Sequence, residues 1–211
     1  MLQMLYQGQY ALFFILIFAL ILSLSFHEFG HALVAKKMGD NTAEMAGRLT
    51  LNPVAHIDPM GMLMVVLIGF GYAKPVPTNP RNFKHKWADF WVSAAGPGMN
   101  LLIAIFAMNL LALAMNMQWT MLTTVAAQTF FITLAVINII LMVFNLIPIG
   151  ALDGHYMLPY FLSTKHAYQY RQFNDKYGNM ILMGLVALSI FGFPVFRFVW
   201  KLGYALLPYI T

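Results

Sequence analysis

The chain has 211 residues, of which 61% are hydrophobic and only 9% are charged, and its formal net charge is +5. A soluble domain carries about 25% charged residues, so this composition excludes a water-soluble surface and indicates an all-α polytopic membrane protein. The basic residues are scattered between apolar runs, which excludes nucleic acid as a partner, and the lack of cysteine excludes disulfides and thiolate metal sites.

The first apolar run, at residues 9 to 38, predicts a membrane-spanning helix. Residues 1 to 9 carry no charged side chain, whereas Lys36 and Lys37 follow the run. A signal peptide has the opposite order, with basic residues before its apolar core. We therefore expect an uncleaved helix whose N-terminus lies outside the cell.

The next segment predicts a small re-entrant β element at the membrane boundary. RLTLNP at 48 to 53 alternates like a short strand, and MGMLMVVLIGFGY at 60 to 72 is too short to span a bilayer easily. KPVPTNPRNFKHK at 74 to 86 is rich in proline, which suits an extended edge strand or a loop. An ordinary surface loop is the alternative for both extended stretches.

Two further long helices are predicted, at residues 89 to 117 and 120 to 147. A basic, polar loop is expected at 164 to 178. Residues 179 to 211 are apolar but are broken by Pro194, and the sequence leaves open whether they span once, form a hairpin or lie at the interface.

We expect one membrane-embedded domain over residues 1 to 211, with a core at about 9 to 160 and a C-terminal apolar region at 179 to 211. Lysine and arginine residues concentrate between 36 and 86 and between 165 and 176, and the N-terminus and the connection near 117 have none. The positive-inside rule then places both basic segments on the cytoplasmic side.

The stretch SFHEFGHALVAKK at 25 to 37 carries the first candidate site. His27 and His31 share one face of a helix about one turn apart, a spacing that lets two imidazoles bind one zinc ion. Glu28 lies beside them and can accept a proton from an activated water molecule. Ionisable residues inside a membrane segment are costly and usually functional, so chance placement is the weaker reading.

A zinc site needs a third protein ligand, and Asp153 in NLIPIGALDG is the best candidate. The other aspartates lie in polar loops or at helix ends, whereas Asp153 follows the third apolar helix. The topology puts it at the cytoplasmic end of that helix, at the same depth as the two histidines. The alternative is a turn aspartate before Gly154, because D-G is a common turn signal.

Three further residues are candidates for lining a polar cleft around the site. Asn100 in GPGMN is a candidate to donate to an oxyanion or position a catalytic group, and Asn145 in NLIP is a candidate to line the cleft. His56 in NPVAHIDPMG is a candidate for contact with substrate or metal. The alternatives are helix packing for the asparagines and a structural hydrogen bond for the histidine.

The motifs together resemble the site-2 protease family of intramembrane zinc metalloproteases. The resemblance covers most of residues 20 to 160 and rests on HEFGH, GRLTLNPVAHIDPMG, GYAKPVPTNPRNF, GPGMN and NLIPIGALDG, in that order. It implies a three-helix catalytic core in a minimal form, without PDZ or nucleotide-sensing CBS domains. It also implies one zinc ion on His27, His31 and Asp153, with Glu28 as the catalytic base.

The resemblance further implies that the substrate is a transmembrane segment of another protein in the lipid bilayer. Such a helix hides its peptide bonds, so we expect the enzyme to bind it as an unwound, extended segment along the β element. The alternative is a membrane zinc transporter or a metal-binding protein without protease activity. That reading does not explain Glu28 within H-E-x-x-H, and a transporter needs metal-binding groups at more than one depth.

Overall fold

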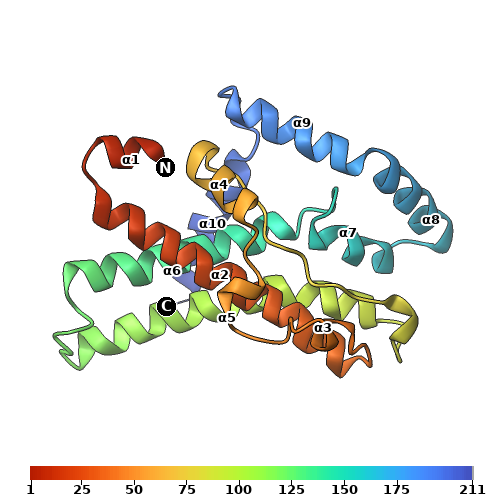
Figure 1. Ribbon diagram of the computed structural model, residues 1–211, viewed down its shortest axis with the longest axis horizontal. Helices are drawn as coiled ribbons and strands as arrows, with labels where there is room; N and C mark the ends of the chain where they lie inside the picture. Colours follow the sequence, from red (N-terminus) through yellow and green to blue (C-terminus); the bar gives the residue numbers. More distant parts are fainter. Residues whose placement is uncertain (211) are drawn as a thin grey trace.

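Three long helices form the centre of the protein, which is described here by a computed structural model covering residues 1–210 (Figure 1). They are α2 (Tyr10–Lys37), α5 (Ala88–Asn116) and α6 (Val125–Asn145), and each is long and apolar enough to cross a membrane. All three pack against one another. The expectation of an all-helical fold with a three-helix core is confirmed over these residues.

The ends of these helices follow from local signals. Lys36 and Lys37 occupy the last turn of α2, where positive charge offsets the helix dipole. The chain then turns at Gly39, whose φ of +104° favours glycine. The side chain of Thr124 accepts a hydrogen bond from the backbone N–H of Ala127 and caps α6, so this helix begins five residues later than predicted.

The apolar core between the long helices is built mainly from small side chains. Small residues let helix backbones approach closely inside a membrane, where the hydrophobic effect does not drive helix association. The buried cluster consists of Ala19, Ala104, Ala107, Leu134, Ala135 and Ile139. Close packing of this cluster holds α2, α5 and α6 in a fixed register. It thereby positions the buried polar residues His27, Glu28 and His31, which lie further along α2.

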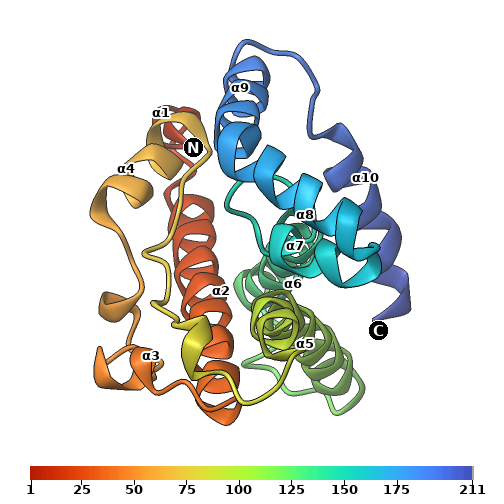
Figure 2. The ribbon, with the colours of Figure 1, turned by 90° about the vertical axis from the view of Figure 1, so that its right-hand side faces the viewer.

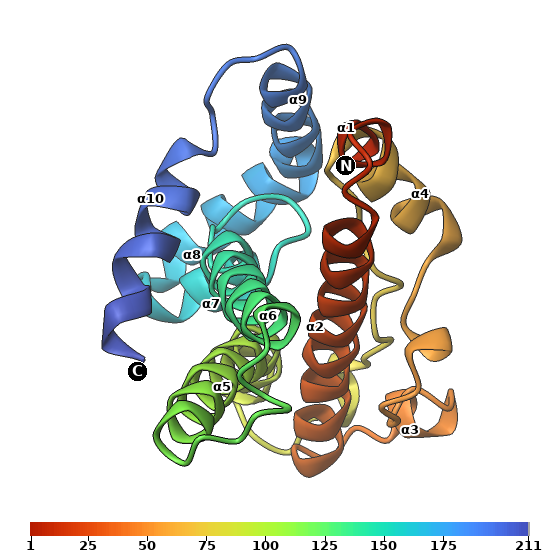
Figure 3. The ribbon, with the colours of Figure 1, turned by 90° about the vertical axis from the view of Figure 1, so that its left-hand side faces the viewer.

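The connection between α2 and α5 lies along one side of α2, and the C-terminal helices lie on the opposite side (Figures 2 and 3). It contains α3 (Thr42–Met45), a 3-10 turn at Pro53–Ala55, α4 (Pro59–Ile68) and a second 3-10 turn at Pro80–Asn82. Asp58 caps α4 by accepting from the N–H of Gly61, and Gly69 ends it in the left-handed conformation.

The predicted β element is not formed among residues 1–210, none of which is in a strand. Residues 48 to 53 form a bend that leads into a 3-10 turn, and residues 70 to 79 have no regular secondary structure. The backbone N–H of Lys74 in this segment donates to the carbonyl of His56 at 2.9 Å. The physical reason is that backbone groups of this extended segment bind side chains of Arg48, Glu28 and Asp40 instead of a neighbouring strand.

The predicted loop at 164 to 178 is helical, so that prediction was wrong. Helix α8 (Thr164–Phe173) continues through a π-helical turn at Asn174–Gly178 into α9 (Asn179–Ile190). The polar composition of residues 164 to 178 suggested a loop. However, no proline or glycine interrupts residues 164 to 177, and an exposed helix can form without an apolar run.

The last apolar region forms a helical hairpin over residues 179–210. A break with Gly192 at φ +92° and with Pro194 separates α9 from α10 (Arg197–Leu206), which is followed by a 3-10 turn at Leu207–Tyr209. Helices of 12 and 10 residues are shorter than the roughly 20 residues that a span requires. Helix α10 packs against α6 and supports the three-helix core.

Candidate metal centre

The three predicted metal ligands meet at one point. His27 and His31 lie on consecutive turns of α2, and Asp153 is the first residue of the short helix α7 (Asp153–Met157). The Nε2 atoms of the two histidines are 3.0 Å apart, and each lies 3.3 Å from a carboxylate oxygen of Asp153. Their possible ligand atoms all lie within 4.8 Å of one another, as one metal ion requires.

Both histidines are oriented by an acceptor on α5. The Nδ1 atom of His27 lies 2.6 Å from Oδ1 of Asn100, and Nδ1 of His31 lies 2.7 Å from the backbone carbonyl of Val92. Each acceptor requires a proton on Nδ1. The Nε2 lone pairs are then free and point into the cluster, which is the arrangement seen for metal-ligating histidines.

The residues present fit a divalent cation. When both Nδ1 atoms are protonated, the two Nε2 atoms cannot donate to Asp153, and Oδ2 of this carboxylate is buried without a hydrogen-bond partner. Such an orphaned buried oxygen is costly unless a cation satisfies it. Two imidazoles and one carboxylate are a ligand set that zinc accepts, with a fourth position left open.

Glycine at position 96 keeps the space in front of the histidines open. A Cβ atom on Gly96 would lie 2.3 Å from Nε2 of His31 and 2.6 Å from Nε2 of His27. Gly30 allows a second close contact between α2 and α5, because a Cβ atom on it would lie 2.8 Å from the carbonyl oxygen of Ala95. Gly30 of HEFGH and Gly96 of GPGMN therefore permit the close approach of α2 and α5 on which the cluster depends.

We predict that Gly96→Ala prevents metal binding, because the added methyl group occupies the space in front of both Nε2 atoms. Loss of a residue that only orients a metal ligand typically lowers metal affinity about 10- to 100-fold. A methyl group that directly obstructs the ligands should therefore lower the affinity by about 100-fold or more. Metal content after dialysis, measured by mass spectrometry, checks this. Gly98→Ala is the matched control, since its Cβ would meet no atom within 4 Å. A fully loaded Gly96→Ala protein would refute the prediction.

Glu28 lies beside the cluster but is not one of the converging metal-binding side chains. It is 7% exposed, and its Oε2 atom accepts a 3.1 Å hydrogen bond from the backbone N–H of Val76. Val76 belongs to the extended segment between α4 and α5, so this segment lies against Glu28. Arg48 holds the same segment by donating to the carbonyl oxygens of Lys74 and Pro75 at 2.5 and 3.0 Å.

Asp40 fixes the far end of the extended segment to the end of α2. Its fully buried carboxylate accepts hydrogen bonds from Thr42, from the backbone N–H of Asn79 at 2.6 Å and from the side chain of Asn82 at 2.8 Å. Burial favours the neutral acid, but these hydrogen bonds outweigh it and hold the pKa of Asp40 below its usual value. The ionised carboxylate therefore anchors the segment that contacts Glu28.

Asn100 belongs to a buried chain of polar side chains that joins all three long helices. Its amide donates to Oδ1 of Asn138 at 2.7 Å and to the backbone carbonyl of Ser23 at 3.4 Å. Asn138 in turn donates to the hydroxyl of Ser23 at 2.8 Å. The Asn100 amide donors are thus used within this chain, and its Oδ1 atom faces Nδ1 of His27. Asn138 and Ser23 were missed by sequence analysis, although each is a polar residue within an apolar run.

Asn145 and His56 lie outside the cluster. The side-chain amide of Asn145 donates to the carbonyl of Leu141 in its own helix at 3.0 Å. His56 is fully buried, with Nε2 2.7 Å from the carbonyl of Thr50 and Nδ1 3.4 Å from the guanidinium of Arg48. These contacts favour the structural alternatives stated for both residues, with His56 supporting Arg48 beneath the extended segment.

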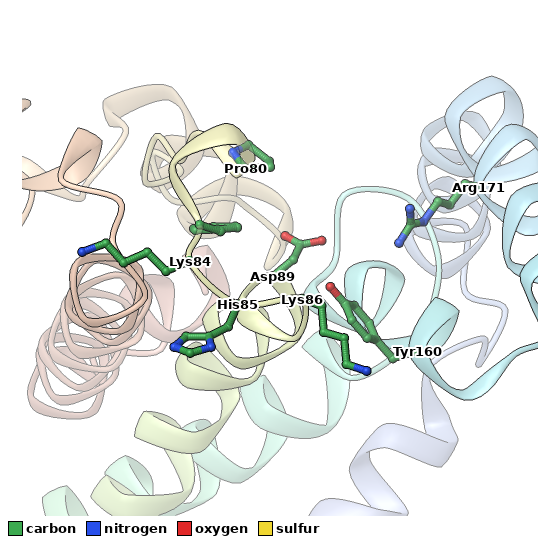
Figure 4. Close-up of a pocket in the computed structure, with 8 residues that line it drawn as sticks. Pro80, Lys84, His85, Lys86, Asp89, Tyr160 and Arg171 are labelled. Atoms are coloured by element: carbon green, nitrogen blue, oxygen red, sulfur yellow. The ribbon is translucent and has the colours of Figure 1, made fainter.

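Two polar pockets open between the start of α5 and the C-terminal helices rather than at the cluster. In the larger one, of about 420 Å³, the guanidinium of Arg171 points toward Asp89, Lys86 runs alongside Tyr160, and Lys84 points away (Figure 4). The smaller one, of about 220 Å³, shares Asp89 and Arg171. Neither is lined by His27, His31 or Asp153, so these surfaces do not define the candidate site.

Comparison with known proteins identifies the class. The model of peptidase family M50 matches residues 15–119 and 112–191, and the chain belongs to this family, which confirms the resemblance to site-2 proteases. Family membership and three long apolar helices together make it a multi-pass membrane protein.

Three named bacterial relatives are similar in sequence. "Putative zinc metalloprotease YwhC" of Bacillus subtilis is 43% identical over 143 residues, which are 66% of this chain and 65% of that protein. The proteins named Rip2 of Mycolicibacterium smegmatis and Mycobacterium tuberculosis are 30% and 32% identical, covering 68% and 69% of this chain and 55% and 57% of theirs. The chain thus spans about two thirds of the first relative and just over half of the others. No solved structure matches it significantly.

Proposed function

We propose that this protein is an intramembrane zinc metalloprotease that hydrolyses peptide bonds within transmembrane segments of other proteins. The observation that carries the proposal is the convergence of His27, His31 and Asp153 beside Glu28, in a helix apolar enough to span the membrane. The names of the relatives, which describe zinc metalloproteases, support the choice of metal and of reaction.

In this proposal the two Nε2 atoms and the Asp153 carboxylate hold one zinc ion. When bound, zinc would act as a Lewis acid. It would polarise the scissile carbonyl and lower the pKa of water, so that the water loses a proton and can attack that carbonyl. Asn100 and the Val92 carbonyl keep the imidazoles in the tautomer that leaves Nε2 free. Gly96 leaves room in front of them for the metal and the reacting groups.

Glu28 acts as the general base and then as the general acid. Its carboxylate takes a proton from the attacking water and passes that proton to the leaving amine, which a single positioned carboxylate can do in sequence. The N–H of Val76 donates to Oε2 and fixes the carboxylate plane. Among residues 1–210, this is the one protein hydrogen bond that the carboxylate accepts, so we assign proton transfer to Oε1.

We further propose that the substrate binds as an unwound, extended segment beside residues 72 to 79. This stretch is extended, lies against Glu28 and is held by Arg48 and Asp40 without a neighbouring strand among residues 1–210. Main-chain pairing with an exposed extended segment is a common way to bind a peptide. The substrate's peptide bonds would then be presented near the cluster, although the β element itself is not formed.

The basic segments give the proposed orientation. The cations at 36 to 86 and 165 to 176 favour the cytoplasmic side, which puts the N-terminus outside and the site toward the cytoplasm. We propose that residues 1–211 act as one membrane-embedded unit. Among residues 1–210, one group of side chains converges as a metal site, and a single depth favours a hydrolase over a transporter.

The test is cleavage of tagged transmembrane helices by the purified full chain in detergent. We expect zinc-loaded protein to cut within the apolar segment of at least one helix in a diverse panel, with the cut located by mass spectrometry. Chelation should stop cleavage, and added zinc should restore it. Zinc binding without cleavage of any helix, together with zinc uptake by proteoliposomes that contain the protein, would establish the transporter instead.

A further inference from the structure

A π-helical turn at Asn174–Gly178 interrupts the helical arm formed by α8 and α9. Such turns are rare and often occur at functional sites, because the extra residue re-aims side chains that a regular helix would direct elsewhere. Asn174 begins this turn and is 5% exposed, whereas the polar residues on either side of it in the arm are exposed. The arm has no role so far in the proposed function.

Asn174 makes a two-point contact with one backbone residue. Its Oδ1 atom accepts from the N–H of Gly150 at 2.8 Å, and its Nδ2 atom donates to the carbonyl of Gly150 at 3.0 Å. Gly150 lies three residues before Asp153 and has φ +62°, in the left-handed region. The amide therefore fixes both backbone groups of Gly150 in the turn that leads into Asp153.

The packing around this contact leaves no room for side chains. A Cβ atom on Gly178 would lie 2.2 Å from Oδ1 of Asn174 and 2.9 Å from the nitrogen of Gly150. A Cβ on Gly150 would lie 2.9 Å from Cδ2 of Leu182 in α9. The arm and the turn thus meet almost backbone to backbone, and the π-helical turn delivers Asn174 into that contact.

A second contact from the same arm holds the same turn. The hydroxyl of Tyr170, four residues before Asn174, donates to the carbonyl of Pro148 at 2.8 Å. Tyr170 also lies 3.2 Å from Nδ1 of His155. The arm therefore contacts the chain on both sides of Asp153, at residues 148 and 150 before it and at residue 155 after it.

We propose that Asn174 is a positioning residue of the metal centre, which sets the turn at 148 to 152 so that the Asp153 carboxylate meets the two histidines. The inference rests on the proposed function. His27 and His31 are fixed by the long helix α2, but Asp153 follows an irregular turn and starts a helix of only five residues. If that turn is not held in advance, metal binding must order it, and affinity falls.

The experiment compares Asn174→Leu and Asn174→Asp with the wild-type full chain in detergent. Leucine has a similar size but makes neither hydrogen bond, and aspartate keeps the acceptor while losing the donor to Gly150. Zinc affinity is measured by competition with a chromophoric chelator, and geometry by the visible spectrum of the cobalt-substituted protein. Loss of a residue that orients a metal ligand typically lowers metal affinity about 10- to 100-fold. We therefore expect the zinc affinity to fall about 10-fold or more in Asn174→Leu and by less in Asn174→Asp. The cobalt spectrum should be altered in both variants.

Gln172→Leu is the matched control, because Gln172 is exposed on the same arm and bonds only Tyr168 within its own helix. A second pair tests the contact from the other side. Gly178→Ala should reproduce the loss, and Gly184→Ala, whose Cβ would meet no atom within 4 Å, should not. Amide hydrogen exchange at residues 149 to 153 of the metal-free protein should quicken in Asn174→Leu and Gly178→Ala alone.

The outcomes separate the inference from the function on which it rests. Wild-type zinc affinity and an unchanged cobalt spectrum in folded Asn174→Leu or Asn174→Asp protein would overturn the positioning role and leave the protease intact. A lower unfolding temperature with unchanged affinity would do the same, since it would show a structural role only. If the wild-type chain binds no zinc, the proposed function itself fails and the inference falls with it.

Discussion

Glu28→Gln should abolish proteolysis while leaving zinc binding intact. Glutamine has nearly the same shape as glutamate, and its amide oxygen can still accept the hydrogen bond from Val76. It cannot take a proton from water at neutral pH, so the general base is lost while the metal ligands remain. General acid–base catalysis typically contributes about 10²- to 10⁴-fold, and we expect a loss of about 10³-fold or more in the initial rate of helix cleavage.

The chain supplies a matched control, because Glu44 is its only other glutamate. Glu44 forms an exposed ion pair with Lys36, and exposed pairs contribute little to stability. Glu44→Gln should therefore cleave at the wild-type rate. Equal cleavage by Glu28→Gln and wild-type protein, at equal zinc content, would show that the carboxylate is not the base and that the mechanism proposed here is wrong.

Asp153→Ala should lose both zinc and activity. The substitution removes one of three protein ligands and leaves two imidazoles, which is one ligand fewer than a catalytic zinc site uses. We expect zinc affinity to fall by about 100-fold or more, beyond the usual effect of an outer-shell change. Because a ligand that binds only the folded state stabilises it, zinc should raise the unfolding temperature of the wild-type protein but not of Asp153→Ala.

Asp175→Ala serves as the control for removal of a carboxylate. Asp175 is 75% exposed at its side chain and lies 4.0 Å from His155, in the arm rather than in the cluster. This variant should bind zinc with nearly wild-type affinity and show the same thermal stabilisation. Wild-type zinc affinity in Asp153→Ala would place the third ligand elsewhere and would contradict the assignment of Asp153.

The long helices could be predicted because their signal is simple. Runs of about 20 apolar residues have few alternatives in a membrane protein, and the predicted ends of α2 and α5 agree with the structure to within one residue. The convergence of Asp153 with the histidines could be anticipated from topology, because both basic segments fall on one side. The motif spacing supplied His27, Glu28 and His31 directly.

The remaining features depend on partners that the local sequence does not reveal. An extended segment becomes a strand only when another segment pairs with it, and here Arg48, Asp40 and Glu28 bind its backbone instead. The polar chain through Asn138, and the contact of Asn174 with Gly150, join residues from separate helices. No spacing rule connects such residues, so sequence analysis did not place them at the site.

X-ray absorption at the zinc edge of the loaded wild-type protein tests the central claim most directly. The structure predicts scattering from two imidazole nitrogens at about 2.0–2.1 Å and from carboxylate oxygen at about 2.0–2.2 Å, the usual distances for these ligands. The carboxylate contribution should be lost in whatever zinc Asp153→Ala retains. A wild-type spectrum without imidazole scattering would mean that His27 and His31 do not hold the metal, and the proposed protease would lose its basis.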